Sequence, residues 1–110
     1  MRIRIILLAC LIFIVSASGP ASADTTIGTK WRPIALGQVN CMYYAGMAIF
    51  RLGFDKSEPG SQSISGKKGE YTASIRCVSD AQIVFFILAG PSPETVQNYL
   101  NVLYSQFPQQ

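Results

Sequence analysis

The chain has 110 residues with nine Lys and Arg, six Asp and Glu and no histidine, which gives a formal net charge of +3. The length excludes more than one domain of ordinary size. The lack of histidine excludes Ser-His and Cys-His nucleophile pairs, and it removes the commonest metal ligand and near-neutral general base.

The first part of the chain has the three parts of a signal peptide. Arg2 and Arg4 precede an uncharged apolar run over 5–15, and Ala21-Ser22-Ala23 gives the A-x-A pattern that a signal peptidase recognises. A membrane-spanning helix needs about 20 apolar residues. We therefore predict a cleaved signal peptide over residues 1–23, no stable membrane anchor afterwards, and a periplasmic or secreted bacterial protein.

The mature chain, residues 24–110, is expected to form a single small domain. Two of the nine basic residues leave with the signal peptide, so seven remain against six acidic ones. A net charge of +1 provides little attraction to nucleic acid. Cys41 and Cys77 remain as an even pair in an exported domain, which predicts a disulfide. Closing that loop stabilises the fold by about 3–4 kcal/mol in the chain-entropy model.

The first half of the mature chain predicts one helix. Residues 24–37 read as an irregular lead-in in which Trp31 could belong to a short edge strand. Apolar residues then recur at three- and four-residue spacing over 39–52, with Asn40 as the N-cap and Gly53 as the stop.

Three strands and a second helix are expected after residue 60. Residues 61–65 form a short strand and 66–69 a turn between glycines. Residues 71–77 alternate as a half-buried strand, and 83–89 are apolar at every position, as in a strand covered on both faces. Ser92 then caps a helix with an apolar stripe that comprises Val96, Tyr99, Leu100, Leu103 and Phe107.

This order predicts an α+β fold with the sequence α-β-β-β-α. We expect a two-layer sandwich in which two helices pack on a three-stranded antiparallel meander. Cys41 on the first helix and Cys77 on the second strand should both face the shared core.

Catalytic, metal-binding and cofactor-binding patterns are lacking. Two cysteines without histidine are too few for a zinc site. All six carboxylates of the mature chain fall in loops, turns or element ends. The Gly66–Gly69 segment lacks the P-loop pattern and its strand-to-helix context. We therefore predict a protein that is not an enzyme, with no metal and no cofactor.

Two groups of residues are candidates for binding a partner. Tyr43, Tyr44, Met47 and Arg51 fall away from the core side of the first helix and could form an exposed anchor patch, since Tyr and Arg are frequent in binding hot spots. Ordinary filling of the core by aromatic residues is the alternative interpretation. On the apolar strand, Val84, Phe86 and Leu88, or their alternates, would lie open if helices cover only one face of the sheet.

The first functional hypothesis is an exported, non-enzymatic protein-interaction module, such as an inhibitor, an immunity-type protein or an envelope accessory protein. A protein partner or self-association as a homodimer would satisfy it. The second is a carrier of a small apolar ligand in a cleft lined by Tyr43, Tyr71 and Phe86. The third is an enzyme that uses Lys, Tyr or carboxylates without histidine.

Overall fold

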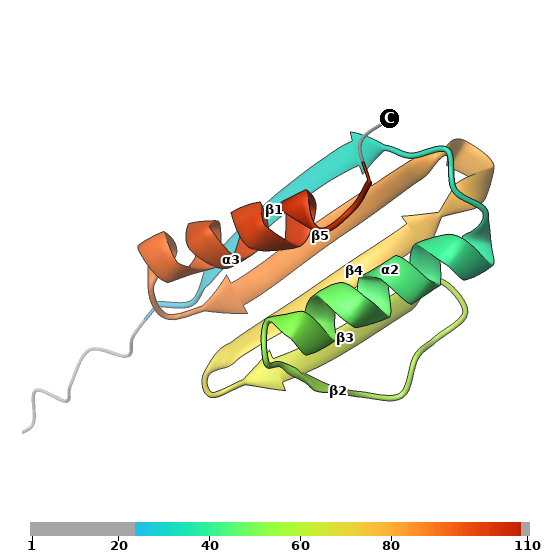
Figure 1. Cartoon of the computed structure of the whole chain (residues 1–110). Helices are drawn as coiled ribbons and strands as arrows, with labels where there is room; N and C mark the ends of the chain where they lie inside the picture. The colour runs from blue at the N-terminus through green and yellow to red at the C-terminus, as the bar shows by residue number, and fades with distance from the viewer. Residues whose placement is uncertain (1–23, 109–110) are drawn as a thin grey trace, which may run out of the picture.

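The computed structural model describes residues 24–108, so the predicted signal peptide lies outside the described residues. The described chain is an α+β fold with two helices and one antiparallel sheet of five strands (Figure 1). The elements are β1 (Thr26–Pro33), α2 (Gln38–Arg51), β2 (Asp55–Lys56), β3 (Ser63–Lys68), β4 (Tyr71–Val78), a 3-10 turn η1 (Ser79–Ala81), β5 (Ile83–Gly90) and α3 (Pro93–Ser105). The strand order is β1-β5-β4-β3-β2.

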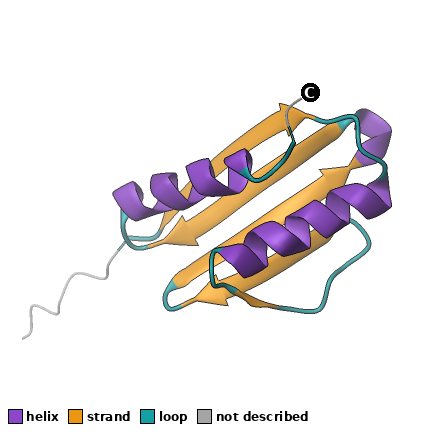
Figure 2. Cartoon of the chain, viewed as in Figure 1, coloured by secondary structure: helices purple, strands orange, loops and turns teal. Residues whose placement is uncertain are grey.

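Both helices lie on the same face of the sheet (Figure 2). α3 packs over β1 and β5, and α2 packs over β3 and β4. The expected meander of three strands is present as β3, β4 and β5, but the sheet is wider than predicted because β1 and β2 extend it on either side.

The lead-in is more regular than expected: the short edge strand considered around Trp31 is present as the eight-residue edge strand β1. Its inward positions are Gly28, Lys30 and Arg32, which do not give the apolar alternation of an ordinary half-buried strand. Arg32 is 6% exposed. Its guanidinium donates to the backbone carbonyls of Tyr104 at 3.3 Å, Phe107 at 3.4 Å and Pro108 at 2.7 Å. A cation at the C-terminal end of α3 satisfies carbonyls that the helix leaves free.

The β3–β4 hairpin turns later than the sequence indicates. The expected turn at 66–69 is wrong because β3 continues through Gly66 to Lys68, and Gly69, with φ +59°, makes the turn. Gly66 lies where α2 ends against the sheet: a Cβ there would stand 2.7 Å from Ile49 Cγ2 and 3.0 Å from Phe54 Cβ. The lack of a side chain at Gly66 therefore allows close packing against this strand.

The N-terminus of α2 differs from the prediction, whereas the N-terminus of α3 agrees with it. Gly37, not Asn40, is the N-cap of α2, and no side chain caps it. Gln38 holds this end instead, since its Nε2 donates to the Cys77 carbonyl at 2.9 Å and its Oε1 accepts from the Ser79 backbone N–H. The predicted cap of α3 is confirmed: the Ser92 hydroxyl accepts from the backbone N–H of Thr95 at 3.3 Å.

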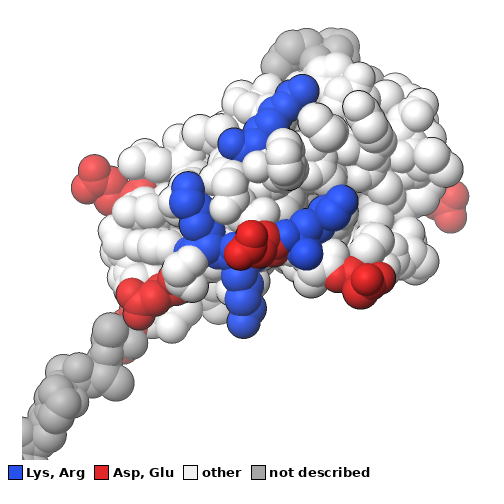
Figure 3. All heavy atoms as spheres, turned by 60° about the horizontal axis from the view of Figure 1, so that its bottom comes forward, with Lys and Arg blue, Asp and Glu red and all other residues white. Residues whose placement is uncertain are grey.

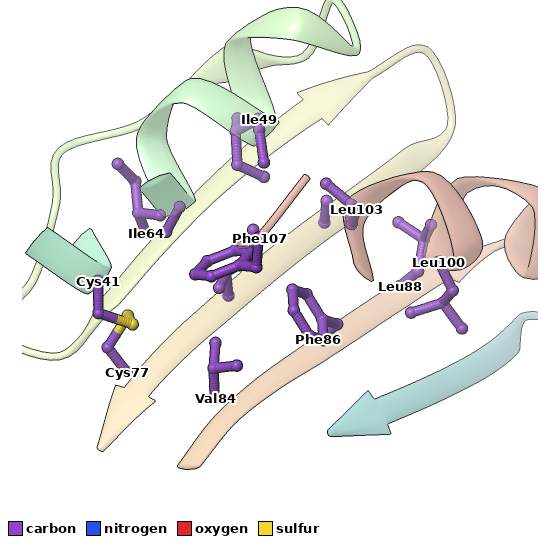
Figure 4. Close-up of a cluster of buried hydrophobic side chains, with 14 of the residues drawn as sticks. Cys41, Ile49, Ile64, Cys77, Val84, Phe86, Leu88, Leu100, Leu103 and Phe107 are labelled. Atoms are coloured by element: carbon purple, nitrogen blue, oxygen red, sulfur yellow. A yellow bond between two sulfur atoms is a disulfide. The ribbon is translucent and has the colours of Figure 1, made fainter. Parts of the chain in front are cut away.

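The core lies between the two helices and the sheet and is joined by the Cys41–Cys77 disulfide (Figure 4). The predicted bond is present and connects α2 to β4, with a Cα–Cα distance of 6.0 Å. Both cysteines are fully buried. Val84, Phe86 and Leu88 are also fully buried here, beneath the helices. They belong to the core and cannot form an exposed surface in this fold.

Their inward direction follows from the sheet register. Phe86 pairs with Ile75, and Val84 pairs with Cys77, on the strand whose alternation already marks its core side. Directly paired residues point to the same face of a sheet. The alternates Phe85 and Ile87 therefore point to the face without helices, where they are 38% and 37% exposed.

Candidate functional site

Helix α2 carries two apolar stripes, of which the core uses one. Cys41, Ala45, Ala48 and Ile49 are buried against the sheet. A second stripe comprises Val39, Tyr43 and Phe50, which are 82%, 64% and 70% exposed. These positions are four and seven residues apart, so they follow one line along the helix. The helix is thus apolar on a side that the described residues leave exposed.

A groove of about 540 Å³ runs beside this second stripe. We call it the α2 groove. Its helix wall is formed by Val39, Met42, Tyr43, Gly46, Met47 and Phe50. Its opposite wall is formed by Lys56, Pro59 and Ile64, which come from β2, the loop after it and β3.

The floor of the groove is shaped by the small residue Gly46. A Cβ built there would lie 3.4 Å from Ile64 Cδ1 and 3.9 Å from Lys56 Nζ, both ordinary distances. Gly46 therefore lacks the tight contact that fixes Gly66 within the fold, and a larger side chain at position 46 would fill the groove. The glycine leaves the helix backbone open to a molecule in the groove.

The groove is apolar with one cation at its wall. Lys56 is the only charged residue among those that line it. Figure 3 brings the edge of the molecule near β2 forward, and there Lys and Arg lie interspersed with Asp and Glu while uncharged surface surrounds them. Within residues 24–108, no three His, Cys, Asp or Glu side chains group as metal ligands. The chemistry this groove offers is burial of apolar groups, with a positive charge at one side.

The four helix residues predicted as an anchor patch separate into two pairs. Tyr43 and Met47 line the groove. Tyr44 turns toward the core, where its ring centroid lies 6.0 Å from that of Phe107. Arg51 donates to the Gln106 side chain at 3.2 Å and so faces α3. The structure therefore places only half of the predicted patch in one surface.

Sequence reasoning missed Val39 and Phe50, the two most exposed large apolar residues of this helix. Their spacing of four and seven residues from Tyr43 was a visible signal, because the core stripe already accounted for the other apolar side. Pro59 and Lys56 could not be found this way, since they reach the groove only through the fold of β2 and its loop.

The cleft expected for a small ligand is not formed by the three residues named for it. Phe86 is fully buried, with ring centroids 5.8 Å from Tyr104 and 5.3 Å from Phe107. Tyr71 packs edge-on against Tyr99. Tyr43 lies on the outer side of α2. Aromatic side chains pack around Phe86 and Tyr71, whereas Tyr43 lines the α2 groove.

No protein-family model matches this chain, and a search of curated proteins finds no relative.

Proposed function

We propose that the mature chain is an exported, non-enzymatic protein-interaction module, such as an inhibitor, an immunity-type protein or an envelope accessory protein, that binds its partner in the α2 groove. The observation that carries the proposal is the second apolar stripe of α2. Exposed large apolar side chains are ordinary when they are scattered, but a contiguous patch is typical of an interaction site. Val39, Tyr43 and Phe50 are contiguous along the helix and flank the groove.

The residues that line the α2 groove favour binding of an apolar protein segment that has an acidic residue beside it. Tyr, Met and Phe are enriched at the centres of protein interfaces, and Tyr43, Met47 and Phe50 stand together here. Lys56 at the wall would pair with a carboxylate on the partner, which fixes orientation more than it adds affinity. An amphipathic helix laid along α2 would meet both requirements.

Export is part of the proposal. The Cys41–Cys77 disulfide is the kind of bond that persists outside the cytosol. No helix among residues 24–108 has the length and hydropathy to span a membrane. Expression of the full chain in a bacterium should yield a protein that begins at Asp24, as read by N-terminal sequencing. A product that retains Arg2 and Arg4 would contradict the export step.

The partner site is tested with two matched helix variants. Phe50→Asp places a charge in the proposed site, and Val102→Asp places one on α3, where the side chain is 41% exposed. The mature protein with a photo-crosslinking residue at position 43 identifies the partner in an envelope extract. Binding of that purified partner should weaken by at least ~10-fold in Phe50→Asp, since interface hot spots contribute about 2 kcal/mol or more. Val102→Asp should bind as the unmodified protein does. Equal affinity of all three proteins would refute the groove as the partner site.

A small apolar-ligand carrier is the second candidate, and the groove volume is the observation that favours it. About 540 Å³ falls within the range of small-molecule pockets. An apolar fluorescent probe should then bind the mature protein and be excluded by Gly46→Leu, which fills the floor. Gly46→Ala is the control for helix stability. Probe binding that Gly46→Leu does not change would exclude this candidate.

A further inference from the structure

The two edges of the sheet are built differently. At one edge β2 has only two residues, Asp55 and Lys56, both charged and exposed. Short, charged edge strands are how proteins prevent pairing with another chain. At the other edge β1 runs for eight residues, and no described strand pairs with its outer side. That edge is the one open to strand addition.

The backbone of β1 shows which residues point outward. The Ile34 N–H donates to the Gln82 carbonyl at 2.9 Å, continuing the β1–β5 ladder beyond its last pair. In an antiparallel ladder, alternate residues direct their N–H and C=O groups to the same side. The even-numbered residues of β1 therefore bond to β5. The backbone groups of Ile27, Thr29 and Trp31 point away from the sheet.

The charged side chains of β1 do not lie where they would prevent strand pairing at this edge. Lys30 Nζ lies 4.6 Å from the centre of the Tyr104 ring. Arg32 donates to carbonyls at the end of α3. Both cations are thus held on the helix side. On the opposite face β1 presents Ile27 and Trp31, which are 69% and 58% exposed. A strand that looks charged in sequence has an uncharged, apolar open face.

We propose that the mature chain forms a homodimer by antiparallel pairing of β1 with β1 of a second copy, with the two-fold axis at Thr29. Thr29 then stands opposite Thr29, and Ile27 opposite Trp31 of the second copy. All three positions have outward backbone groups, so these pairs exchange about six hydrogen bonds. Ile27 and Trp31 form cross-strand pairs of a β-branched and an aromatic residue, which stabilise sheets.

Two of the other possible registers are disfavoured. Moving the axis by half a residue would set outward groups against inward ones, and no ladder would form. Moving it to Lys30 would place two ammonium groups opposite each other and set Ile27 against Pro33, which has no N–H to donate. Centring the pair on Thr29 instead sets Lys30 against Gly28 of the second copy.

The helix layer fits a second copy of the same chain. α3 contacts both β1 and β5, and it is close to the sheet, since a Cβ at Gly28 would lie 2.6 Å from Leu100 Cδ1. A helix axis midway between two strands lies about 2.4 Å inside the edge strand, because strands are spaced by about 4.8 Å. Two copies joined at β1 would then hold their α3 axes roughly 9–10 Å apart, the distance of packed helices. Beside the buried Val96 and Leu100, the exposed α3 residue near Gly28 is Gln97, whose Nε2 would lie 3.3 Å from a Cβ there. Asn101 follows one turn later, and both Gln97 and Asn101 are uncharged.

The test uses the disulfide-bonded chain of residues 24–110. Light scattering across a concentration series should approach twice the mass of one chain. Under a mild oxidant, Thr29→Cys should become a covalent dimer, because the Cα atoms of a hydrogen-bonded antiparallel pair lie about 5.5 Å apart, within reach of a disulfide. Ser74→Cys is the matched control, since Ser74 is on β4 in the middle of the sheet and would stay far from its copy.

The register is tested by mixing two tagged variants. Ile27→Cys and Trp31→Cys should cross-link to each other, and neither should cross-link to itself. A monomer at every concentration would overturn the proposal. So would a dimer in which Ser74→Cys cross-links and Thr29→Cys does not, since this means packing of open sheet faces. The inference does not depend on the α2 groove: Phe50→Asp should leave the dimer mass unchanged, so failure of one proposal is distinguishable from failure of the other.

Discussion

Removing the disulfide should lower the stability of the domain by an amount that the loop length sets. Cys41 and Cys77 are separated by 36 residues. The chain-entropy model gives about 3.8 kcal/mol for a loop of this size at 25 °C. A domain of this length has a free energy of unfolding of roughly 4–13 kcal/mol. The double variant Cys41→Ala/Cys77→Ala should therefore lose a large part of its stability.

The measurement is urea unfolding of the mature protein and the double variant, followed by far-UV circular dichroism. In thermal unfolding the same loss corresponds to a decrease of roughly 15–30 °C in Tm for a domain of this size. Alanine leaves a small cavity at two fully buried positions, which adds to the loss. The m-value should rise, because the unfolded chain without the cross-link exposes more surface.

Two controls make this prediction refutable. Thiol labelling of the unfolded, unreduced protein should find no free cysteine, and two labelled thiols would show that the bond is absent. The reduced parent protein should match the double variant in stability to within about 1 kcal/mol. A loss below about 1 kcal/mol on removing a bond shown to exist would mean that the folded state, or residual structure in the unfolded chain, offsets the loop entropy.

Three further stability changes follow from contacts in the fold, each measured by urea unfolding. Arg32→Met should lower the free energy of unfolding by about 2–4 kcal/mol, because charge-assisted hydrogen bonds to three carbonyls at the end of α3 are lost. An unchanged free energy of unfolding would mean that water replaces the guanidinium. Ser92→Ala should cost about 1 kcal/mol through loss of the α3 cap, while Ser92→Asp should retain stability. Gly66→Ala should destabilise by about 1–3 kcal/mol through crowding against Ile49, whereas Gly46→Ala should stabilise by up to about 1 kcal/mol; the same sign at both positions would contradict the packing described.

The residues that define local structure were readable from the sequence. The stripe of Val96, Leu100 and Leu103, with Ser92 before it, predicted α3 because helix periodicity and capping act over a few residues. The alternation over 71–77 likewise predicted β4 and its core side. The helical spacing over 39–52 and the alternation over 71–77 placed Cys41 and Cys77 on facing surfaces, so the disulfide was predictable before the fold was known.

The sheet's edges and open surfaces required the tertiary structure. Residues 83–89 are apolar at every position, so only the register with β4 decides that Phe86 is buried and Phe85 exposed. The sequence indicated only a possible short edge strand around Trp31 and not the full length of β1, because Arg32 finds its acceptors in carbonyls 72 to 76 residues away, at the end of α3. A local sequence pattern cannot reveal such partners, because a charged side chain can be buried only when a distant segment supplies its hydrogen bonds.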